Sequence, residues 1–194
     1  MPESQSARTR GRRIRCEAVW TTRTRPMRPA DLPVVLQVNQ ANVPEVGDLD
    51  LDRLRFIVDE AAIALVVERM NERDPERSEA IVGFCLVLAP GSTYDSVNYR
   101  WFMQHHPDSM YLDRVAFTSD ARGQGLGSQL YDTVDDIMRE EHPEAPALTL
   151  EVNVDPPNEP SLAFHAKHGF VEVGRQISHG IEVSLMRRAV SPQA

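Results

Sequence analysis

Three glycines at alternate positions, Gly123, Gly125 and Gly127, are the residues of this sequence whose spacing first suggests chemistry. An apolar stretch typical of a strand precedes them and a helical pattern follows, all within residues 110–130. The first N–H groups of a helix have no partner inside the helix, and the helix dipole adds partial positive charge there. Because glycine has no Cβ, an anion can approach such a backbone closely. The segment therefore predicts an anion-binding turn, with a glycine-rich helix entry that binds no ligand as the alternative.

Two well-known phosphate-binding loops do not fit this segment. The dinucleotide-binding fingerprint needs a third glycine where Ser128 stands, and a P-loop needs a lysine at the turn, whereas the chain has only Lys167. What remains is Arg122-Gly123-Gln124-Gly125-Leu126-Gly127, which has the spacing Arg/Gln-x-x-Gly-x-Gly/Ala. This spacing resembles the acetyl-CoA pyrophosphate loop of the GNAT superfamily of N-acetyltransferases.

The glycine turn must be held by a strand before it and a helix after it, and the chain predicts further elements of both kinds. Apolar patterns predict strands at 21–27, 63–67, 81–88, 110–117, 148–154, 170–176 and 181–187, and helices beginning near 32 and spanning 51–61, 126–141 and 159–168. Pro26 makes the first of these an edge strand. Residues 90–108 are expected to form a long, aromatic-rich loop with a function. The order β-α-α-β-β-β-α-β-α-β-β predicts an α/β (α+β) fold with a mixed sheet, parallel at 110–154.

Composition favours one soluble globular domain. The chain has 194 residues, 41% of them hydrophobic, and no apolar run approaches the ~20 residues that cross a bilayer. Eight arginines against two glutamates give residues 1–28 a net charge of +6 within a total of −8. We expect residues 1–20 to be a disordered Arg-rich tail and residues 21–190 to form a single domain. Cys16 and Cys85 have no metal-site spacing and fit a reducing, cytoplasmic location.

A second motif makes the resemblance more specific. Members of the GNAT superfamily commonly have Asn, a small residue three positions on, an aromatic residue seven on, and Gly-Phe at eleven and twelve. The matching residues here are Asn158, Ser161, His165, Gly169 and Phe170. The predicted order of elements is also that of the GNAT fold, and the resemblance covers residues 22–188. It implies a central sheet that splays apart between the strands at 110–117 and 148–154.

The resemblance implies acetyl-CoA as co-substrate and no metal. The pyrophosphate is expected on the N–H groups of the glycine turn, and the pantetheine arm on the strand before it, paired like an additional strand. Asn158 is expected to contact the pantetheine, to cap the helix that follows it, or to do both. The implied cofactor-binding residues are Val115, Ala116, Phe117, Arg122, Gly123, Gln124, Gly125, Leu126, Gly127, Ser128, Asn158 and His165.

The implied reaction is attack of a primary amine on the thioester. It needs a base, because an amine with a pKa of about 10 is mostly protonated at pH 7. Candidates are Glu151 and Asp113, with Glu45 a weaker one, and a solvated or salt-bridged carboxylate is the alternative for each. His165 stands where the superfamily often has the Tyr that protonates the leaving thiolate. We expect His165 either to take that role or to line the pantetheine channel.

The acceptor site is expected between the loops at 42–47 and 94–102. Its candidate residues are Asn42, Glu45, Tyr94, Tyr99, Arg100 and Trp101. Packing of the second loop onto the core is the alternative for the aromatic ones. We expect an amine-bearing partner, either a small molecule or a peptide, and no membrane, and we leave a homodimer open. Two other hypotheses are a CoA-binding sensor or regulatory module without catalysis, and nucleic-acid binding by the Arg-rich tail, which is the least favoured.

Overall fold

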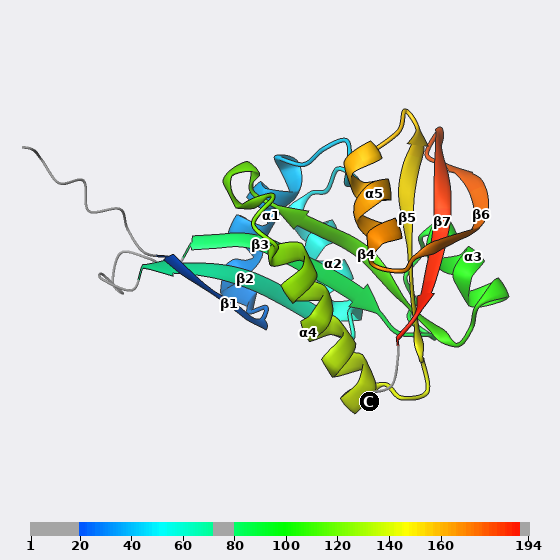
Figure 1. Cartoon of the computed structure of the whole chain (residues 1–194), viewed down its shortest axis with the longest axis horizontal. Coiled ribbons are helices and arrows are strands. Elements are labelled where there is room, and N and C mark those ends of the chain that lie inside the picture. The colour runs from blue at the N-terminus through cyan, green and yellow to red at the C-terminus, as the bar shows by residue number, and fades with distance from the viewer. Residues whose placement is uncertain (1–19, 72–79, 191–194) are drawn as a thin grey trace, which may run out of the picture.

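A computed structural model describes residues 20–71 and 80–190 of the chain (Figure 1). In this part of the chain, seven strands form one sheet in the order β1-β2-β3-β4-β5-β7-β6. Neighbouring strands are antiparallel except β4 and β5, which are parallel. The strands are β1 (Trp20–Pro26), β2 (Ile63–Asn71), β3 (Ala80–Leu88), β4 (Ser109–Phe117), β5 (Ala147–Asp155), β6 (Val171–Ser178) and β7 (Ile181–Ala189).

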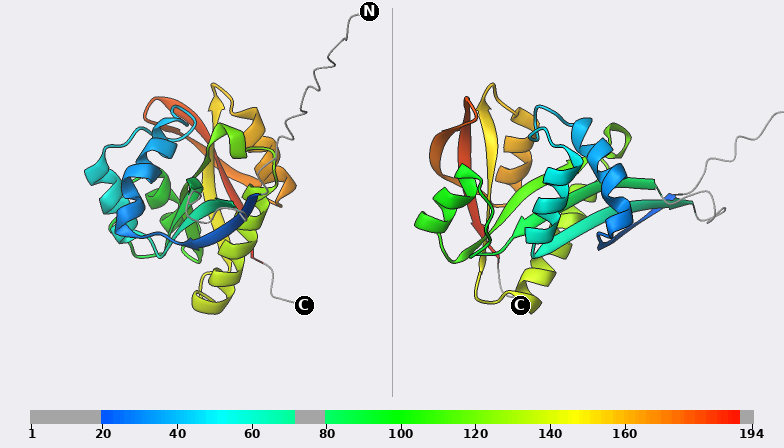
Figure 2. Two further views of the ribbon diagram at one scale, coloured as in Figure 1. Left: turned by 90° about the vertical axis from the view of Figure 1, so that its left-hand side faces the viewer. Right: turned by 180° about the vertical axis from the view of Figure 1, so that it is seen from behind.

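Helices cover both faces of this sheet (Figures 1 and 2). One face carries α1 (Leu32–Gln40), α2 (Leu51–Glu60) and α3 (Val97–His105), and the other carries α4 (Leu126–Glu141) and α5 (Glu159–Lys167). Because successive strand residues point to opposite faces, Phe84 and Cys85 on β3 serve different cores. Cys85 is fully buried, and this burial raises the pKa of its thiol to about 12.

The sheet opens between its two parallel strands. Only three pairs join β4 to β5, the last being Tyr111 with Thr149, and the strands then diverge (Figure 1). Helix α4 connects the two strands and packs against the apolar face that β4 and β5 share, as expected for a strand–helix–strand unit. The mixed sheet with a splayed centre, predicted from the sequence, is confirmed.

One predicted element was wrong. Residues 90–108, expected to be a loop, contain α3. The Ser96 side chain caps this helix by accepting hydrogen bonds from the backbone N–H groups of Asn98 and Tyr99. Tyr99 and Phe102, one helical turn apart, are buried against the sheet. The helix therefore forms because an N-cap is followed by a short apolar stripe. The stripe consists of aromatic residues, which the sequence analysis attributed to a functional loop.

Other boundaries agree with expectation. The first strand lies at the sheet edge, as Pro26 indicated, and the Asn158 side chain caps α5 by accepting from the N–H of Ser161. The expected tail at 1–20 lies outside the described residues except for Trp20. Within the described residues, every helix is too short or too polar to cross a bilayer.

Candidate functional site

The open edge of β4 offers unpaired backbone groups. The N–H of Thr118 donates to the carbonyl of Val82 on β3 at 2.8 Å. In an antiparallel ladder, alternate residues face the partner strand, so Val115 and Phe117 turn their N–H and C=O groups away from β3, toward the splay. The Phe117 carbonyl there accepts a hydrogen bond from the Asn42 side chain at 3.1 Å. The sequence prediction for this stretch, an edge that accepts an extended ligand, matches this arrangement.

The glycine turn follows directly at the same end of β4. Gly123 and Gly125 have φ angles of 75° and 80°, a left-handed conformation that other residues rarely adopt. A Cβ added at either position would meet no atom within 4 Å, so open space lies beside the backbone. Gly127 has a different role, since a Cβ there would lie 3.1 Å from the Phe164 ring on α5. Two glycines thus shape the entry to α4, and the third lets α5 pack closely.

Side chains around the turn hold it in place. The exposed Arg122 guanidinium donates to the side-chain oxygen of Asn42, the residue that also bonds the Phe117 carbonyl. Gln124 donates to the Asp120 carbonyl at 2.6 Å, and the Ser128 hydroxyl lies 3.0 Å from Nε2 of His168. The predicted anion-binding residues are therefore brought together at the N-terminus of α4.

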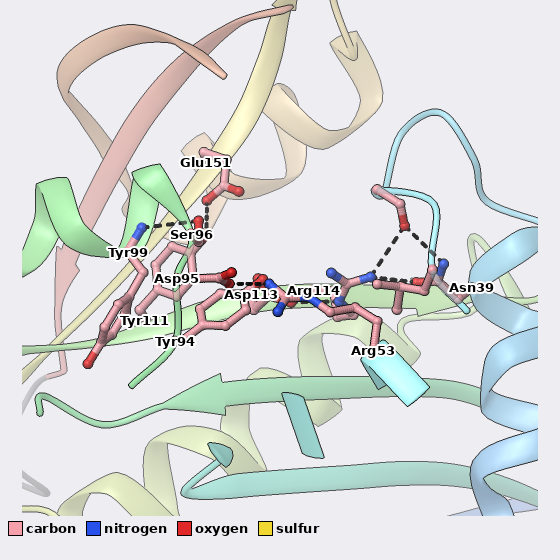
Figure 3. A network of polar contacts seen from close by, with 12 residues as sticks. Asn39, Arg53, Tyr94, Asp95, Ser96, Tyr99, Tyr111, Asp113, Arg114 and Glu151 are labelled. Carbon is pink, nitrogen blue, oxygen red and sulfur yellow. Dashed lines mark hydrogen bonds and ion pairs between the residues drawn. The ribbon is translucent and has the colours of Figure 1, made fainter. Parts of the chain in front are cut away.

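A β-bulge places Asp113 at the mouth of the splay. Leu86 and Val87 on β3 pair with Arg114 and Leu112, which leaves Asp113 as an extra residue in β4. The bulge puts two consecutive side chains on one face, where Arg114 Nε donates to Asp113 Oδ2 at 2.6 Å. The other carboxylate oxygen accepts from the Tyr94 hydroxyl at 2.6 Å (Figure 3). Asp113 is thus part of a buried ion pair.

The Arg114 side chain extends this network to the segment after α1. Its NH1 group donates to Asn39 Oδ1 at 2.9 Å and to the Gly47 carbonyl at 3.3 Å. Figure 3 shows this row of contacts running from Tyr94 to Asn39. The network therefore connects the bulge with the 42–47 loop, where the acceptor site was expected.

Glu151 faces the same side of the sheet from β5. Its carboxylate accepts a hydrogen bond from the Tyr111 hydroxyl at 2.7 Å (Figure 3). Asn98 on α3, whose amide donates to the Ser178 hydroxyl at 3.3 Å, also favours the charged form of Glu151. Burial and, to a lesser extent, the negative charge of Asp113 together raise the pKa of Glu151 to about 7, against the opposing effect of the Tyr111 hydrogen bond. A carboxyl group that titrates near neutral pH is suited to accept and release a proton.

His165 lies on the other face, between α4 and α5. Its Nδ1 lies 2.7 Å from the Ser161 carbonyl, which only accepts, so Nδ1 carries the proton and Nε2 accepts from the Tyr131 hydroxyl at 2.8 Å. Burial lowers the pKa of His165 to about 4, so the ring is neutral at pH 7. With both nitrogens occupied, His165 joins the two helices, and its expected part in catalysis stays a prediction.

The predicted acceptor residues fall into separate places. Tyr94, Tyr99 and Arg100 line one hollow of about 460 Å³ beside α3. The Tyr99 hydroxyl donates to the Ala89 carbonyl at 2.8 Å and so also fixes the turn before α3. Trp101 lies against β6, and Glu45 is exposed in the loop after α1. Asn42 belongs to the Arg122 contact described above.

Comparison with known proteins decides the family. A model of the acetyltransferase (GNAT) family matches residues 38–170. The chain belongs to this family. GNAT enzymes are N-acetyltransferases that use acetyl-CoA as co-substrate, and the resemblance drawn from the two sequence motifs is confirmed. No curated protein matches the chain in sequence.

Solved structures share the GNAT fold at low sequence identity. Ard1 from Thermoplasma volcanium is 19% identical, with a TM-score of 0.66 over 88% of this chain and 99% of that one. The ribosomal-protein-S18-alanine N-acetyltransferase from Escherichia coli is 15% identical, with a TM-score of 0.64 over 90% and 97%. NAA60 from Arabidopsis thaliana, solved in complex with acetyl-CoA, is 16% identical, with a TM-score of 0.63 over 87% and 98%. At these identities the likeness is one of fold.

The residues of this GNAT domain fit the co-substrate. The space beside Gly123 and Gly125 leaves the helix entry open to a pyrophosphate, and the free edge at Val115 and Phe117 suits an amide-bearing arm. Among residues 20–71 and 80–190, no group of three or more His, Cys, Asp or Glu side chains is arranged to hold a metal ion.

Sequence reasoning missed four polar residues of the site, Asn39, Asn98, Tyr111 and Arg114. Tyr111 and Arg114 contact a predicted carboxylate directly, Asn39 holds Arg114, and Asn98 bonds Ser178 and Gln176 beside the site. For Arg114 the signal was obscured, because adjacent residues of a regular strand point to opposite faces. Asn98 could have been found more easily. The Ser96 cap indicates a helix that begins at Val97, which places the Asn98 amide in the first turn of that helix.

Proposed function

We propose that this GNAT domain transfers the acetyl group of acetyl-CoA to a primary amine, with Glu151 as the base. The observation that carries the proposal is the position of Glu151 on β5, just past the last β4–β5 pair, with a pKa of about 7. At that pKa a substantial fraction of the carboxylate is ionised at neutral pH and able to take a proton from an ammonium group.

The steps follow from the residues of the splay. Glu151 removes one proton from the acceptor ammonium, and the nitrogen lone pair then forms the new bond to the acetyl carbon. A backbone N–H on the open edge of β4 donates to the oxygen on which negative charge develops. The carbon–sulfur bond breaks, the sulfur keeps the electron pair, and the second amine proton ends on that sulfur. Glu151 releases its proton to water before the next turnover.

The acceptor is proposed to reach Glu151 between the 42–47 loop and α3. The relatives named above include a ribosomal-protein alanine N-acetyltransferase, which makes peptide N-termini sensible members of an acceptor panel beside small amines. Tyr94, Asn42, Glu45, Tyr99, Arg100 and Trp101 stay predictions as acceptor contacts. A cytoplasmic location and a homodimer also stay predictions.

The test is a thiol-release assay with acetyl-CoA over small amines, amino acids and peptides. Turnover of at least one acceptor by the wild type is expected, and Glu151→Gln should abolish it while acetyl-CoA binding, measured by calorimetry, is unchanged. Binding without turnover of any acceptor would instead favour a CoA-binding sensor or regulatory module. Lack of binding would contradict both functions.

A further inference from the structure

Two carboxylates occupy matching positions at the mouth of the splay. The last pair between the parallel strands joins Tyr111 to Thr149. Asp113 is two residues beyond this pair on β4, and Glu151 is two residues beyond it on β5 (Figure 3). Both side chains face the layer that contains α3, so the two acids face one site from neighbouring strands.

Their partners differ in charge. Asp113 has a cationic partner, the Arg114 guanidinium, and a neutral one, the Tyr94 hydroxyl, so each of its oxygens accepts a hydrogen bond. Glu151 accepts from a neutral group, the Tyr111 hydroxyl, and has no cationic partner of its own among the described residues. The Asp113 side chain is only 4% exposed and its geometry is fixed on both sides.

The groups around Glu151 come from four elements. Strand β4 contributes Tyr111, Asp113 and Arg114, α3 contributes Asn98, and the segment before α3 contributes Tyr94. On the side of β7, the residue paired with Glu151 is the apolar Leu185. The negative charge of Asp113 disfavours the ionised form of Glu151, and the positive charge of Arg114 opposes this effect.

We propose that Asp113 is a positioning residue whose fixed negative charge, on the neighbouring strand, disfavours ionisation of the Glu151 carboxyl, and that Tyr111 favours its ionisation by hydrogen bonding to the carboxylate. This inference rests on the proposed function only in taking Glu151 as the base. A like charge nearby disfavours ionisation, whereas a hydrogen bond to the carboxylate favours it. Asp113 itself accepts no proton in the reaction.

The proposal predicts shifts of opposite sign. Asp113→Asn removes the negative charge of Asp113 and leaves the positive charge of Arg114, so the pKa of Glu151 should fall by about 1 unit or more. Tyr111→Phe keeps the ring in its buried place and removes one donor to the carboxylate, so the pKa should rise by roughly 1 unit. Combining both changes should bring the value back toward that of the wild type.

The experiment is a titration of the Glu151 carboxyl by carbon-13 NMR in the full-length protein, with the signal assigned by its loss in Glu151→Gln. Tyr99→Phe is the matched control, because Tyr99 packs on Tyr111 but donates its hydroxyl proton to the Ala89 carbonyl. That control should leave the Glu151 pKa within about 0.3 units of the wild type, less than the shift expected from one lost hydrogen bond. The titration needs no acceptor, so its outcome is independent of whether any amine is acetylated.

The acid limb of kcat/KM, measured with any acceptor that turns over, should move in the same directions as the NMR values. Unchanged Glu151 titration in both Asp113→Asn and Tyr111→Phe would overturn the proposal. Complete loss of turnover in Asp113→Asn at every pH, with the fold intact by circular dichroism, would identify Asp113 as the base and would also overturn it. If Asp113→Asn fails to fold because Arg114 is left unpaired, the double variant Asp113→Asn/Arg114→Gln replaces it, with a smaller fall in pKa expected.

Discussion

The two halves of the proposed site differ in the groups that form them, because one consists of backbone groups and the other of side chains. The donor half consists of backbone groups, namely the free edge of β4 and the N–H groups that follow Gly123 and Gly125. The acceptor half consists of side chains from four elements that meet around Asp113 and Glu151. Backbone sites need only a turn and an open strand, whereas side-chain sites need several separate segments to arrive together. Changes on the two halves should therefore affect different measured quantities.

The largest effect is expected from Glu151→Gln on the acceptor half. Loss of a general base typically lowers the rate by about 10²- to 10⁴-fold. We expect kcat to fall by about this factor, whereas calorimetric binding of acetyl-CoA stays unchanged, because the change touches no backbone group of the splay. Weaker donor binding in this variant would show that the two halves are not separable.

A smaller effect is expected from Gly125→Ala on the donor half. At a φ of 80° an alanine strains the backbone by about 1 kcal/mol or more, so the helix entry should shift and the dissociation constant of CoA should rise about tenfold. The matched control is Gly180→Ala in the β6–β7 turn, which has a φ of 81° and equally open surroundings. Equal loss of CoA binding in both variants would mean that general destabilisation, and not the turn, is responsible.

Gly174→Ala tests the acceptor half through the contact between β6 and α3. A Cβ at Gly174 would lie 2.8 Å from the Trp101 ring, so the ring on α3 or the strand β6 would have to shift. We expect a loss of stability of about 1–2 kcal/mol and a several-fold higher KM for the acceptor, with the CoA dissociation constant unaltered. Thermal unfolding and steady-state kinetics measure the two effects. A changed CoA affinity with an unchanged acceptor KM would contradict the assignment of α3 to the acceptor side.

The last effect concerns stability and not the reaction, and it involves His165, which joins α4 and α5. Its folded-state pKa of about 4 lies below the ordinary value, so as the pH falls from about 6.5 to 4 the unfolded chain takes up a proton that the folded ring does not. The free energy of unfolding should therefore decrease on acidification, by at most about 1.4 kcal/mol per pH unit from this residue. Denaturant titrations of His165→Gln should show a shallower dependence over that window. An equally steep dependence would place the titrating group elsewhere.

The proposed donor half could be predicted from the sequence because its signals are local. The residues from 110 to 130 contain strand, turn and helix start in succession, and the Asn158 motif adds an N-cap whose partner is three residues away. The acceptor half was not readable to the same degree. Residue pairs such as Tyr111 with Glu151, or Arg114 with Asn39, are separated by 40 and 75 positions, and no periodicity links them. The bulge at Asp113 depends on how β3 and β4 pair, which composition does not specify.

The same bulge has a consequence for the comparison of related sequences. Leu112 and Arg114 would alternate correctly between the two cores if they were adjacent, so Asp113 is one position that the ladder does not require. A relative with a one-residue gap at this point would keep the neighbouring side chains on their present faces, lose the second carboxylate, and leave Arg114 and Tyr94 without that partner. Presence or absence of the bulge residue therefore decides whether one acid or two face the splay.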